Sequence, residues 1–169
     1  RPRVAVLATG DELTASNEGL SHGKIYNSNG PALCAALSRW DIPVADMGIV
    51  KDDPAALRAA LAAALACADV ILATGGVSVG DFDYTRTVLQ ELGVREIFWK
   101  VAIKPGKPLF FGIHEAAHAS PKLVFGLPGN PLAALVCLEE LVRPALEKMQ
   151  GYAPAHQSYH LVGKALNDY

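Results

Sequence analysis

A short apolar run followed by a glycine-punctuated loop limits the folds open to this chain. Residues 69–74 (Asp-Val-Ile-Leu-Ala-Thr) are nearly all apolar, as in a strand that is buried on both faces of a sheet. The loop after it contains Gly75, Gly76 and Gly80, and helical spacing of apolar residues resumes at position 84. In open α/β sheets the ligand crevice lies beyond the carboxyl ends of the strands, so we expect this loop to bind a ligand.

Two carboxylates complicate a simple anion site in this loop. The N-terminal amides of the following helix favour an anion, whereas Asp81 and Asp83 repel one unless a cation lies between them. Mg²⁺ fits such a place, because it binds carboxylate and substrate oxygens together. The alternative is that Asp81 or Asp83 only caps the helix.

Strand and helix patterns alternate along the chain with short connections. Apolar patterns predict strands at 3–9, 42–50, 69–74, 97–103, 109–113 and 123–127, and helices at 31–40, 54–68, from 84, and at 131–149. This order predicts a three-layer α/β/α fold with a mostly parallel sheet. We expect residues 1–150 to form this domain. Residues 151–169 are expected to be a linker and the first strand (159–164) of a small β domain.

The composition argues against several classes of function. A chain of 169 residues that is 51% hydrophobic can bury one good core. The 15 basic and 17 acidic residues form no block of like charge, which disfavours nucleic acid as a partner. No apolar segment reaches the roughly 20 residues of a membrane span, and the first residues lack the apolar core of a signal peptide. We expect a cytoplasmic protein, excised from a longer chain, whose scattered Cys34, Cys67 and Cys137 are buried thiols.

Acidic residues also follow two other predicted strands. Residues 9–12 (Thr-Gly-Asp-Glu) come directly after the first strand, where they form either a ligand-binding loop or an ordinary turn. Asp52 and Asp53 precede Pro54, which suits the first position of a helix. Asp53 then suits the N-cap, and Asp52 is free to serve a site.

Lysines gather in residues 100–108 (Lys-Val-Ala-Ile-Lys-Pro-Gly-Lys-Pro). In a strand, Lys100 and Lys104 project from one face, and polyproline geometry through Gly106 returns Lys107 to the side of Lys104. Three ammonium groups could then converge on one anion. The alternative is a solvated edge strand, where lysine and proline discourage aggregation.

Two further loops lead into predicted helices. In residues 126–131 (Gly-Leu-Pro-Gly-Asn-Pro), Asn130 suits the N-cap and Pro131 the first helical position. The two glycines before them suggest a tight loop whose amides face an anion. Residues 28–31 (Ser-Asn-Gly-Pro) have the same organisation.

Six motifs of the chain resemble, in their order, the molybdopterin-binding domain of the MoeA family, which includes the E domain of gephyrin. They are T-G-D-E-L, N-S-N-G, D-D-P, G-G-V-S-V-G-D-F-D-Y-T, K-P-G-K-P and G-L-P-G-N-P. The resemblance covers residues 4–151 and implies a molybdopterin molybdotransferase. Such an enzyme inserts molybdate into adenylylated molybdopterin and releases AMP. The resemblance also implies a homodimer of the full-length protein and a partner adenylyltransferase.

The resemblance further implies roles for individual residues. Those tied to activity are Glu12, Asp52, Asp83, Lys100 and Lys104, with Mg²⁺ held by Asp52 and Asp83. The implied ligand-binding residues are Thr9, Gly10, Asp11, Ser28, Asn29, Gly75, Gly76, Ser78, Gly80, Asp81, Lys107, Gly126, Pro128, Gly129 and Asn130. We expect Glu12 to orient a water or the pterin, and the lysines with Ser78 to hold molybdate or phosphate oxygens.

Two alternatives belong to other classes of function. An adenylyltransferase of the MogA type shares the fold and the pterin but attaches AMP, and it would carry a G-G-T-G loop with a different acid pattern. A binding module or scaffold would perform no chemistry. Members of the resembling family are longer, and their active site is built partly from another subunit. We therefore expect this chain alone to bind ligand with weak or absent turnover.

Overall fold

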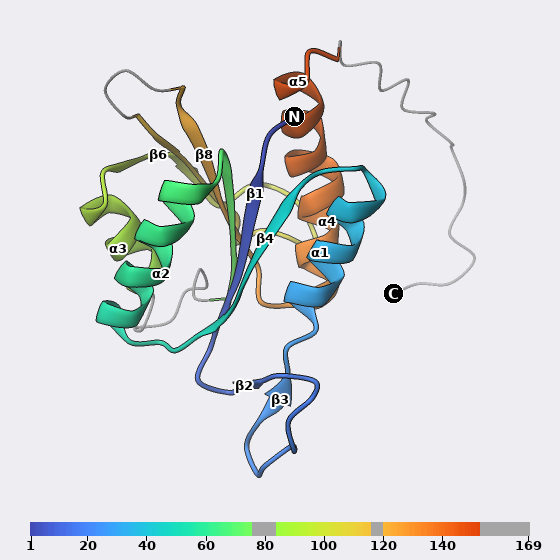
Figure 1. The fold of residues 1–169 in the computed structure, drawn as a ribbon, viewed down its shortest axis with the longest axis vertical. Coiled ribbons are helices and arrows are strands. Elements are labelled where there is room, and N and C mark those ends of the chain that lie inside the picture. The colour runs from blue at the N-terminus through green and yellow to red at the C-terminus, as the bar shows by residue number, and fades with distance from the viewer. Residues whose placement is uncertain (76–83, 116–119, 153–169) are drawn as a thin grey trace.

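The computed structural model describes residues 1–75, 84–115 and 120–152. In these residues helices cover both faces of a six-stranded sheet (Figure 1). The strands of this sheet are β1 (Val4–Thr9), β4 (Val44–Val50), β5 (Val70–Thr74), β6 (Val94–Trp99), β7 (Phe110–His114) and β8 (Lys122–Leu127). The helices are α1 (Asn29–Arg39), α2 (Pro54–Cys67), α3 (Tyr84–Glu91), α4 (Pro131–Cys137), η1 (Leu138–Val142) and α5 (Arg143–Met149).

The sheet has the strand order β4-β1-β5-β8-β7-β6. The first four of these strands are parallel, whereas β7 is antiparallel to both β8 and β6. The predicted α/β fold with a mostly parallel sheet is therefore confirmed, with an antiparallel hairpin at one side. Because β7 is antiparallel to both of its neighbours, β6 runs in the same direction as β8, and both strands end at the same edge of the sheet.

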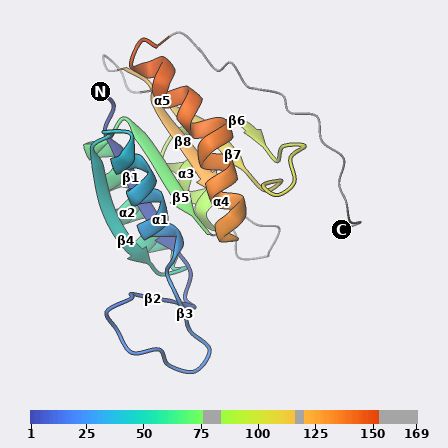
Figure 2. The ribbon, with the colours of Figure 1, turned by 90° about the vertical axis from the view of Figure 1, so that its right-hand side faces the viewer.

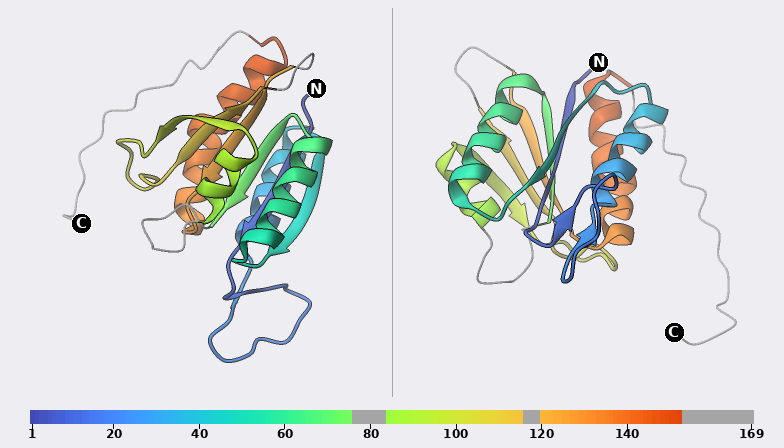
Figure 3. Two further views of the ribbon diagram at one scale, coloured as in Figure 1. Left: turned by 90° about the vertical axis from the view of Figure 1, so that its left-hand side faces the viewer. Right: turned by 60° about the horizontal axis from the view of Figure 1, so that its bottom comes forward.

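Two apolar layers hold the helices to the sheet. Helices α2 and α3 pack on one face, and α1, α4 and α5 pack on the other (Figures 2 and 3). Every residue of β5 is buried, as expected for a strand that is covered on both faces. The predicted stripe of Leu57, Leu61 and Leu65 on α2 is also buried. All three cysteines are free thiols, as expected, but only Cys137 is buried, whereas Cys34 is half-buried and Cys67 is exposed.

The predicted strand at 97–103 is wrong at both ends. β6 begins at Val94 and ends at Trp99. Lys100 has a φ of 70° and Gly106 a φ of 124°, so neither the strand nor polyproline geometry continues through this segment. The two predicted alignments of lysine side chains therefore do not hold.

A small arm projects from the sheet edge where the sequence analysis predicts a loop between the first strand and the first helix (Figure 1). In this β2–β3 arm, β2 (Leu13–Thr14) pairs in parallel with β3 (Ile25–Tyr26). The Ile25 N–H donates to the carbonyl of Glu12 at 2.8 Å, and the Asn27 N–H donates to the carbonyl of Thr14 at 2.9 Å. These bonds pair the two strands of the arm with each other.

The predicted closing helix at 131–149 is confirmed as the continuous run α4, η1 and α5. The wider π turn of η1 ends at Val142, two residues before Pro144, which has no N–H to donate to an ordinary helical bond. The strand predicted at 159–164 lies outside the described residues. None of the described helices is both long and apolar enough to cross a membrane.

Candidate functional site

The predicted loops meet along one edge of the sheet. The strand pairing aligns Leu7, Ala73, Gly126, Phe110 and Trp99 in one row from β1 to β6. The segments that follow β1, β5, β8 and β6 all begin just beyond this row. With a strand spacing of about 4.8 Å, the row is roughly 19 Å long. This edge can therefore contact several separate groups of one extended ligand.

Asn29, at the start of α1, links the end of β5 to the loop after β8. Its Nδ2 donates to Thr74 Oγ1 at 2.8 Å and to the carbonyl oxygen of Gly129 at 2.8 Å. Thr74 Oγ1 in turn donates to the carbonyl oxygen of Pro128 at 3.2 Å. The start of α1, the end of β5 and the loop after β8 thus form one junction.

Gly75 allows this junction to close on β1. It has a φ of 85°, and a Cβ at this position would lie 2.3 Å from the carbonyl oxygen of Thr9. A Cβ on Gly129 would meet the Cα of Gly75 at 3.8 Å, an ordinary contact. Gly75 therefore uses the freedom of glycine both to adopt a positive φ and to let β1 and the end of β5 approach each other closely.

A cavity of about 90 Å³, the junction cavity, lies among these segments. Its lining includes six of the predicted site residues, namely Thr9, Glu12, Ser28, Asn29, Gly75 and Gly129. Thr9 Oγ1 and Asn29 Oδ1 are buried and have no hydrogen-bond partner within the described part of the chain. Unpaired buried polar atoms are uncommon in proteins, so these two atoms mark a place for a ligand or water.

Asp11, Glu12 and Asp52 bring negative charge together where β1 and β4 end. The Asp52 N–H donates to Asp11 Oδ1 at 3.2 Å. Burial raises the pKa of Asp52, a backbone hydrogen bond with Asp11 lowers it, and the charges of Asp11 and Glu12 raise it, so that the net shift is upward. The ionised carboxylate is thus disfavoured as it stands, and a bound cation would favour it.

Asp53 is the N-cap of α2, as predicted, because its Oδ2 accepts from the Ala56 N–H at 2.8 Å. Asp52 is therefore free of that task. Asp83, the other expected Mg²⁺ ligand, lies outside the described residues. Over residues 1–75, 84–115 and 120–152, no three histidine, cysteine or acidic side chains are grouped so as to hold a metal ion.

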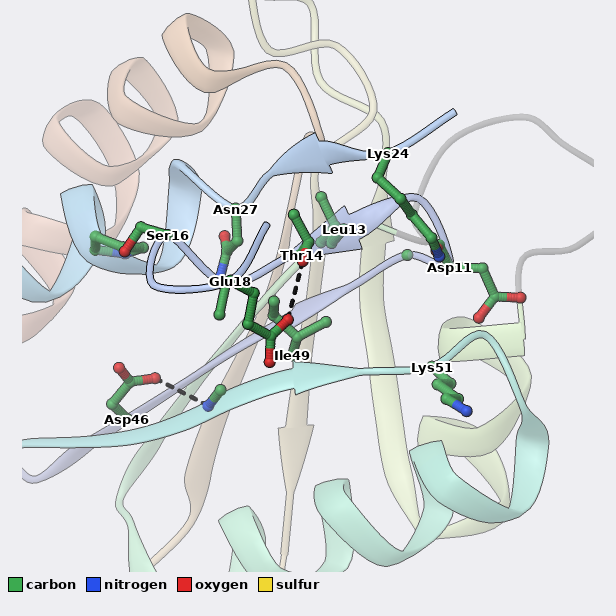
Figure 4. A pocket seen from close by; sticks show the side chains of 14 residues that line it. Asp11, Leu13, Thr14, Ser16, Glu18, Lys24, Asn27, Asp46, Ile49 and Lys51 are labelled. Carbon is green, nitrogen blue, oxygen red and sulfur yellow. Dashed lines mark hydrogen bonds between the residues drawn. The ribbon is translucent and has the colours of Figure 1, made fainter. Parts of the chain in front are cut away.

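A groove of about 900 Å³ lies between the β2–β3 arm and β4 (Figure 4). Lys24 Nζ donates to the carbonyl oxygen of Asp11, and Thr14 Oγ1 donates to Glu18 Oε2 at 2.9 Å. Asp46 Oδ1 accepts from the Gly48 N–H at 2.9 Å. Much of the charge on these walls is therefore already engaged within the chain.

The lysine segment also lies at this edge, but in a different form from the predicted one. Lys100 Nζ lies 4.0 Å from the centroid of the Trp99 ring, and the guanidinium carbon of Arg86 lies 4.4 Å from the same ring. A Cβ on Gly106 would meet Cys137 Sγ at 2.8 Å, so the segment packs closely against α4. Lys104 and Lys107 are exposed.

The remaining predicted residues include two at helix starts, three buried near the junction and five outside the described residues. Asn130 is the N-cap of α4, with its Oδ1 accepting from the Ala133 N–H at 3.1 Å, whereas the Ser28 side chain makes no capping bond to α1. Gly10, Gly126 and Pro128 are buried close to the junction. Five predicted residues, Gly76, Ser78, Gly80, Asp81 and Asp83, lie outside the described residues.

Two residues of the junction were not among the predicted site residues. Asn27 lines both the junction cavity and the groove, and its Oδ1 accepts from the Gly30 N–H at 3.0 Å. Thr74 receives the Asn29 bond. Asn27 lies inside the N-S-N-G motif, and Thr74 directly precedes the glycine loop. The sequence motifs therefore pointed to this region, but ligand binding was predicted for the neighbouring residues.

Comparisons with known proteins identify relatives of the chain. The family model described as "Probable molybdopterin binding domain" matches residues 5–148. A molybdopterin molybdenumtransferase from Haemophilus influenzae is 43% identical over 149 residues, which are 88% of this chain and 35% of that protein. One from a Nostoc species is 41% identical over 153 residues, covering 90% of this chain and 35% of that protein.

Among solved structures, a molybdopterin biosynthesis MoeA protein from Pyrococcus horikoshii is 36% identical with a TM-score of 0.78. The match covers 89% of this chain and 36% of that one. The chain thus spans about a third of the length of these relatives.

Proposed function

Because the chain belongs to the family of molybdopterin-binding domains, we propose that it carries the substrate loops of a molybdopterin molybdenumtransferase. The substrates are adenylylated molybdopterin and molybdate, and the reaction releases AMP and leaves molybdenum on the dithiolene of molybdopterin. The main support is the single sheet edge, where acids follow β1 and β4 and lysines follow β6. A substrate that combines a heterocycle, phosphates and an oxyanion needs both kinds of group.

The acids serve the phosphate end of the substrate. In this proposal Asp52 and Asp83 would hold Mg²⁺, which would supply positive charge to neutralise the phosphates when AMP leaves. The raised pKa of Asp52 supports the fit, since a carboxylate that is costly to ionise gains from a cation beside it. Asp11 donates no proton in this scheme and helps to position Asp52 through its bond to the Asp52 N–H.

The lysines serve the oxyanion. Lys100, Lys104 and Lys107, together with Ser78, bind molybdate or phosphate oxygens. Lys100 follows β6 directly and therefore starts from the same edge as the loop after β8. The amides at the start of α4 add partial positive charge on that side.

Glu12 and the junction residues contact the part of the substrate that is neither phosphate nor oxyanion. Glu12 orients either a water or the pterin, and the residues around the junction bind the ligand through backbone and side-chain groups. The loop glycines Gly76 and Gly80, with Asp81, complete the set.

The full-length protein is proposed to act as a homodimer in the cytoplasm and to receive its substrate from an adenylyltransferase. The matched region covers only 35% of each of these relatives. We therefore expect the chain alone to bind ligand with weak or absent turnover.

Isothermal titration calorimetry of the 169-residue chain with AMP tests the proposal. We expect heat of binding that depends on Mg²⁺, and Asp52→Asn should remove that dependence. Asp46→Asn is the matched control, because it neutralises another acid of the β4 region, in mid-strand and away from the strand end. The absence of heat with AMP, molybdate and Mg²⁺ together would overturn the proposal and favour a scaffold.

A further inference from the structure

The junction cavity presents oxygen acceptors to its occupant. The Gly129 carbonyl can only accept, so the Asn29 atom that faces it is the amide nitrogen, and Oδ1 is the unpaired atom. Thr9 Oγ1 is the other unpaired atom, on a residue that is only 3% exposed. An occupant with N–H groups would pair both atoms.

Glu12 adds a carboxylate to this lining. A Cβ on Gly10 would stand 2.6 Å from Glu12 Oε2, so the carboxylate lies folded back over the glycine. The missing side chain of Gly10 is what leaves room for it. A negative charge beside an amide oxygen makes the cavity unfavourable for phosphate or molybdate, which carry negative charge and accept hydrogen bonds.

Adjacent donors fit this set of acceptors best. The pyrimidinone ring of a pterin carries a 2-amino group next to N3–H, and a carboxylate can accept from two such parallel donors at once. Adenine instead places its amino group next to an acceptor nitrogen, which opposes a carboxylate. The chemistry of the cavity therefore favours the pterin end of the substrate over the adenine end.

The size of the cavity indicates how much of the ring enters. About 90 Å³ corresponds to roughly three water molecules, which is room for the edge of one ring but not for two fused rings. Ile25 and Tyr26 of the β2–β3 arm also line the cavity and are 56% and 45% exposed. Such apolar surface beside a polar cavity can pack on the part of a flat ring that remains outside.

We propose that the junction cavity recognises the pterin, with Glu12 and Asn29 Oδ1 accepting from its 2-amino and N3–H groups and Thr9 Oγ1 completing the set. The β2–β3 arm covers the exposed part of the ring. The proposal rests on the proposed function and assigns Glu12 to the pterin rather than to a water. The phosphates and molybdate then bind farther along the sheet edge, toward the lysines.

Titration of the chain with free pterin (2-amino-4-oxopteridine), followed by the fluorescence anisotropy of the pterin, tests this assignment. Loss of one neutral hydrogen bond in Thr9→Val should weaken binding roughly three- to tenfold. Glu12→Gln, which places a donor where an acceptor is needed, should weaken it roughly tenfold or more. Thr85→Val is the matched control, because Thr85 on α3 also has a buried hydroxyl without a described partner but lies outside the lining of the cavity. It should leave pterin binding unchanged.

Ile25→Ala keeps the test decisive if Thr9→Val fails to fold, because Ile25 is largely exposed. It should weaken pterin binding and leave Mg²⁺-dependent AMP binding unchanged. The assignment would be overturned if pterin binding were unchanged in Thr9→Val and in Ile25→Ala. It would also be overturned if adenosine displaced pterin with equal affinity. If AMP still binds in that case, the proposed function stands, whereas failure of both ligands to bind removes both proposals.

Discussion

The contact between Gly75 and β1 makes Gly75→Ala a demanding test of the junction. A residue with a Cβ at a φ of 85° sits in the left-handed region, which costs about 1–2 kcal/mol. The new Cβ would also lie 2.3 Å from the carbonyl oxygen of Thr9, whereas ordinary contact begins at 3.4 Å.

Relief of that clash requires β1 and the end of β5 to separate by about 1 Å, and overpacking of this kind costs about 1–3 kcal/mol. The strands resist separation because Ala8 and Thr74 are paired directly before the junction. We therefore expect Gly75→Ala to lower the free energy of unfolding by about 2–5 kcal/mol.

Urea unfolding followed by circular dichroism measures this loss, and Gly93→Ala is its matched control. Gly93 has a φ of 82°, but the nearest atoms to its Cβ belong to His114 at 3.9 and 4.0 Å, an ordinary contact. This control should lose only the conformational part, about 1–2 kcal/mol. Equal losses in the two variants would refute the claim that Thr9 and Gly75 are in obligatory contact.

Three further substitutions test other parts of the structure. Because burial raises the pKa of Asp52 above 3.8, the native state binds its proton more readily than the unfolded state, and stability falls as pH rises through the native pKa. Without Mg²⁺, Asp52→Asn should be more stable than wild type in urea unfolding at pH 7 and equal to it below pH 3.8, and a less stable variant at pH 7 would contradict this. Trp99→Leu removes the ring that both Arg86 and Lys100 contact and should cost about 1–2 kcal/mol in thermal unfolding. An unchanged melting temperature would show that these cation–π contacts are not stabilising. Asp53→Ala should cost about 1 kcal/mol through loss of the α2 cap, with Asp53→Ser restoring most of it, and failure of serine to do so would point to another role for the carboxylate.

Local patterns were sufficient to predict the parallel half of the fold. The continuous apolar run of β5 and the Asp-Pro and Asn-Pro pairs that begin α2 and α4 each depend on residues close together in sequence. The direction of β7 was also within reach. Parallel neighbours need a crossover of a dozen or more residues, and the ten residues between β6 and β7 are too few.

The misassigned end of β6 shows where an apolar pattern misleads. Val101 is apolar because it packs on the layer formed by α1 and α4, not because it continues the strand. The Lys100 N–H donates to the Leu109 carbonyl at 2.8 Å and the Val101 N–H to the Lys107 carbonyl at 2.9 Å, so the segment folds back on itself. The β2–β3 arm was missed for a simpler reason, since strands of two residues are too short to show a period.

At the site, residue types and loop positions were predictable but contacts were not. Glycines and acids after strands indicated a ligand-binding edge, and Thr9, Glu12 and Asn29 do line one cavity. The role of Asn29 in joining β5 to the loop after β8 depends on the pairing of distant strands. No local pattern contains that information.

The Asn29 bonds also bear on when the site forms as the chain folds. The amide reaches Thr74 across 45 residues and Gly129 across 100 residues. Closing such a long loop carries an entropy cost that is recovered only once β8 has docked beside β5. A nascent chain that ends before position 129 lacks one wall of the junction, whatever structure its earlier strands have reached. Ligand binding at the junction therefore distinguishes finished molecules from intermediates, and its free energy stabilises only the completed fold.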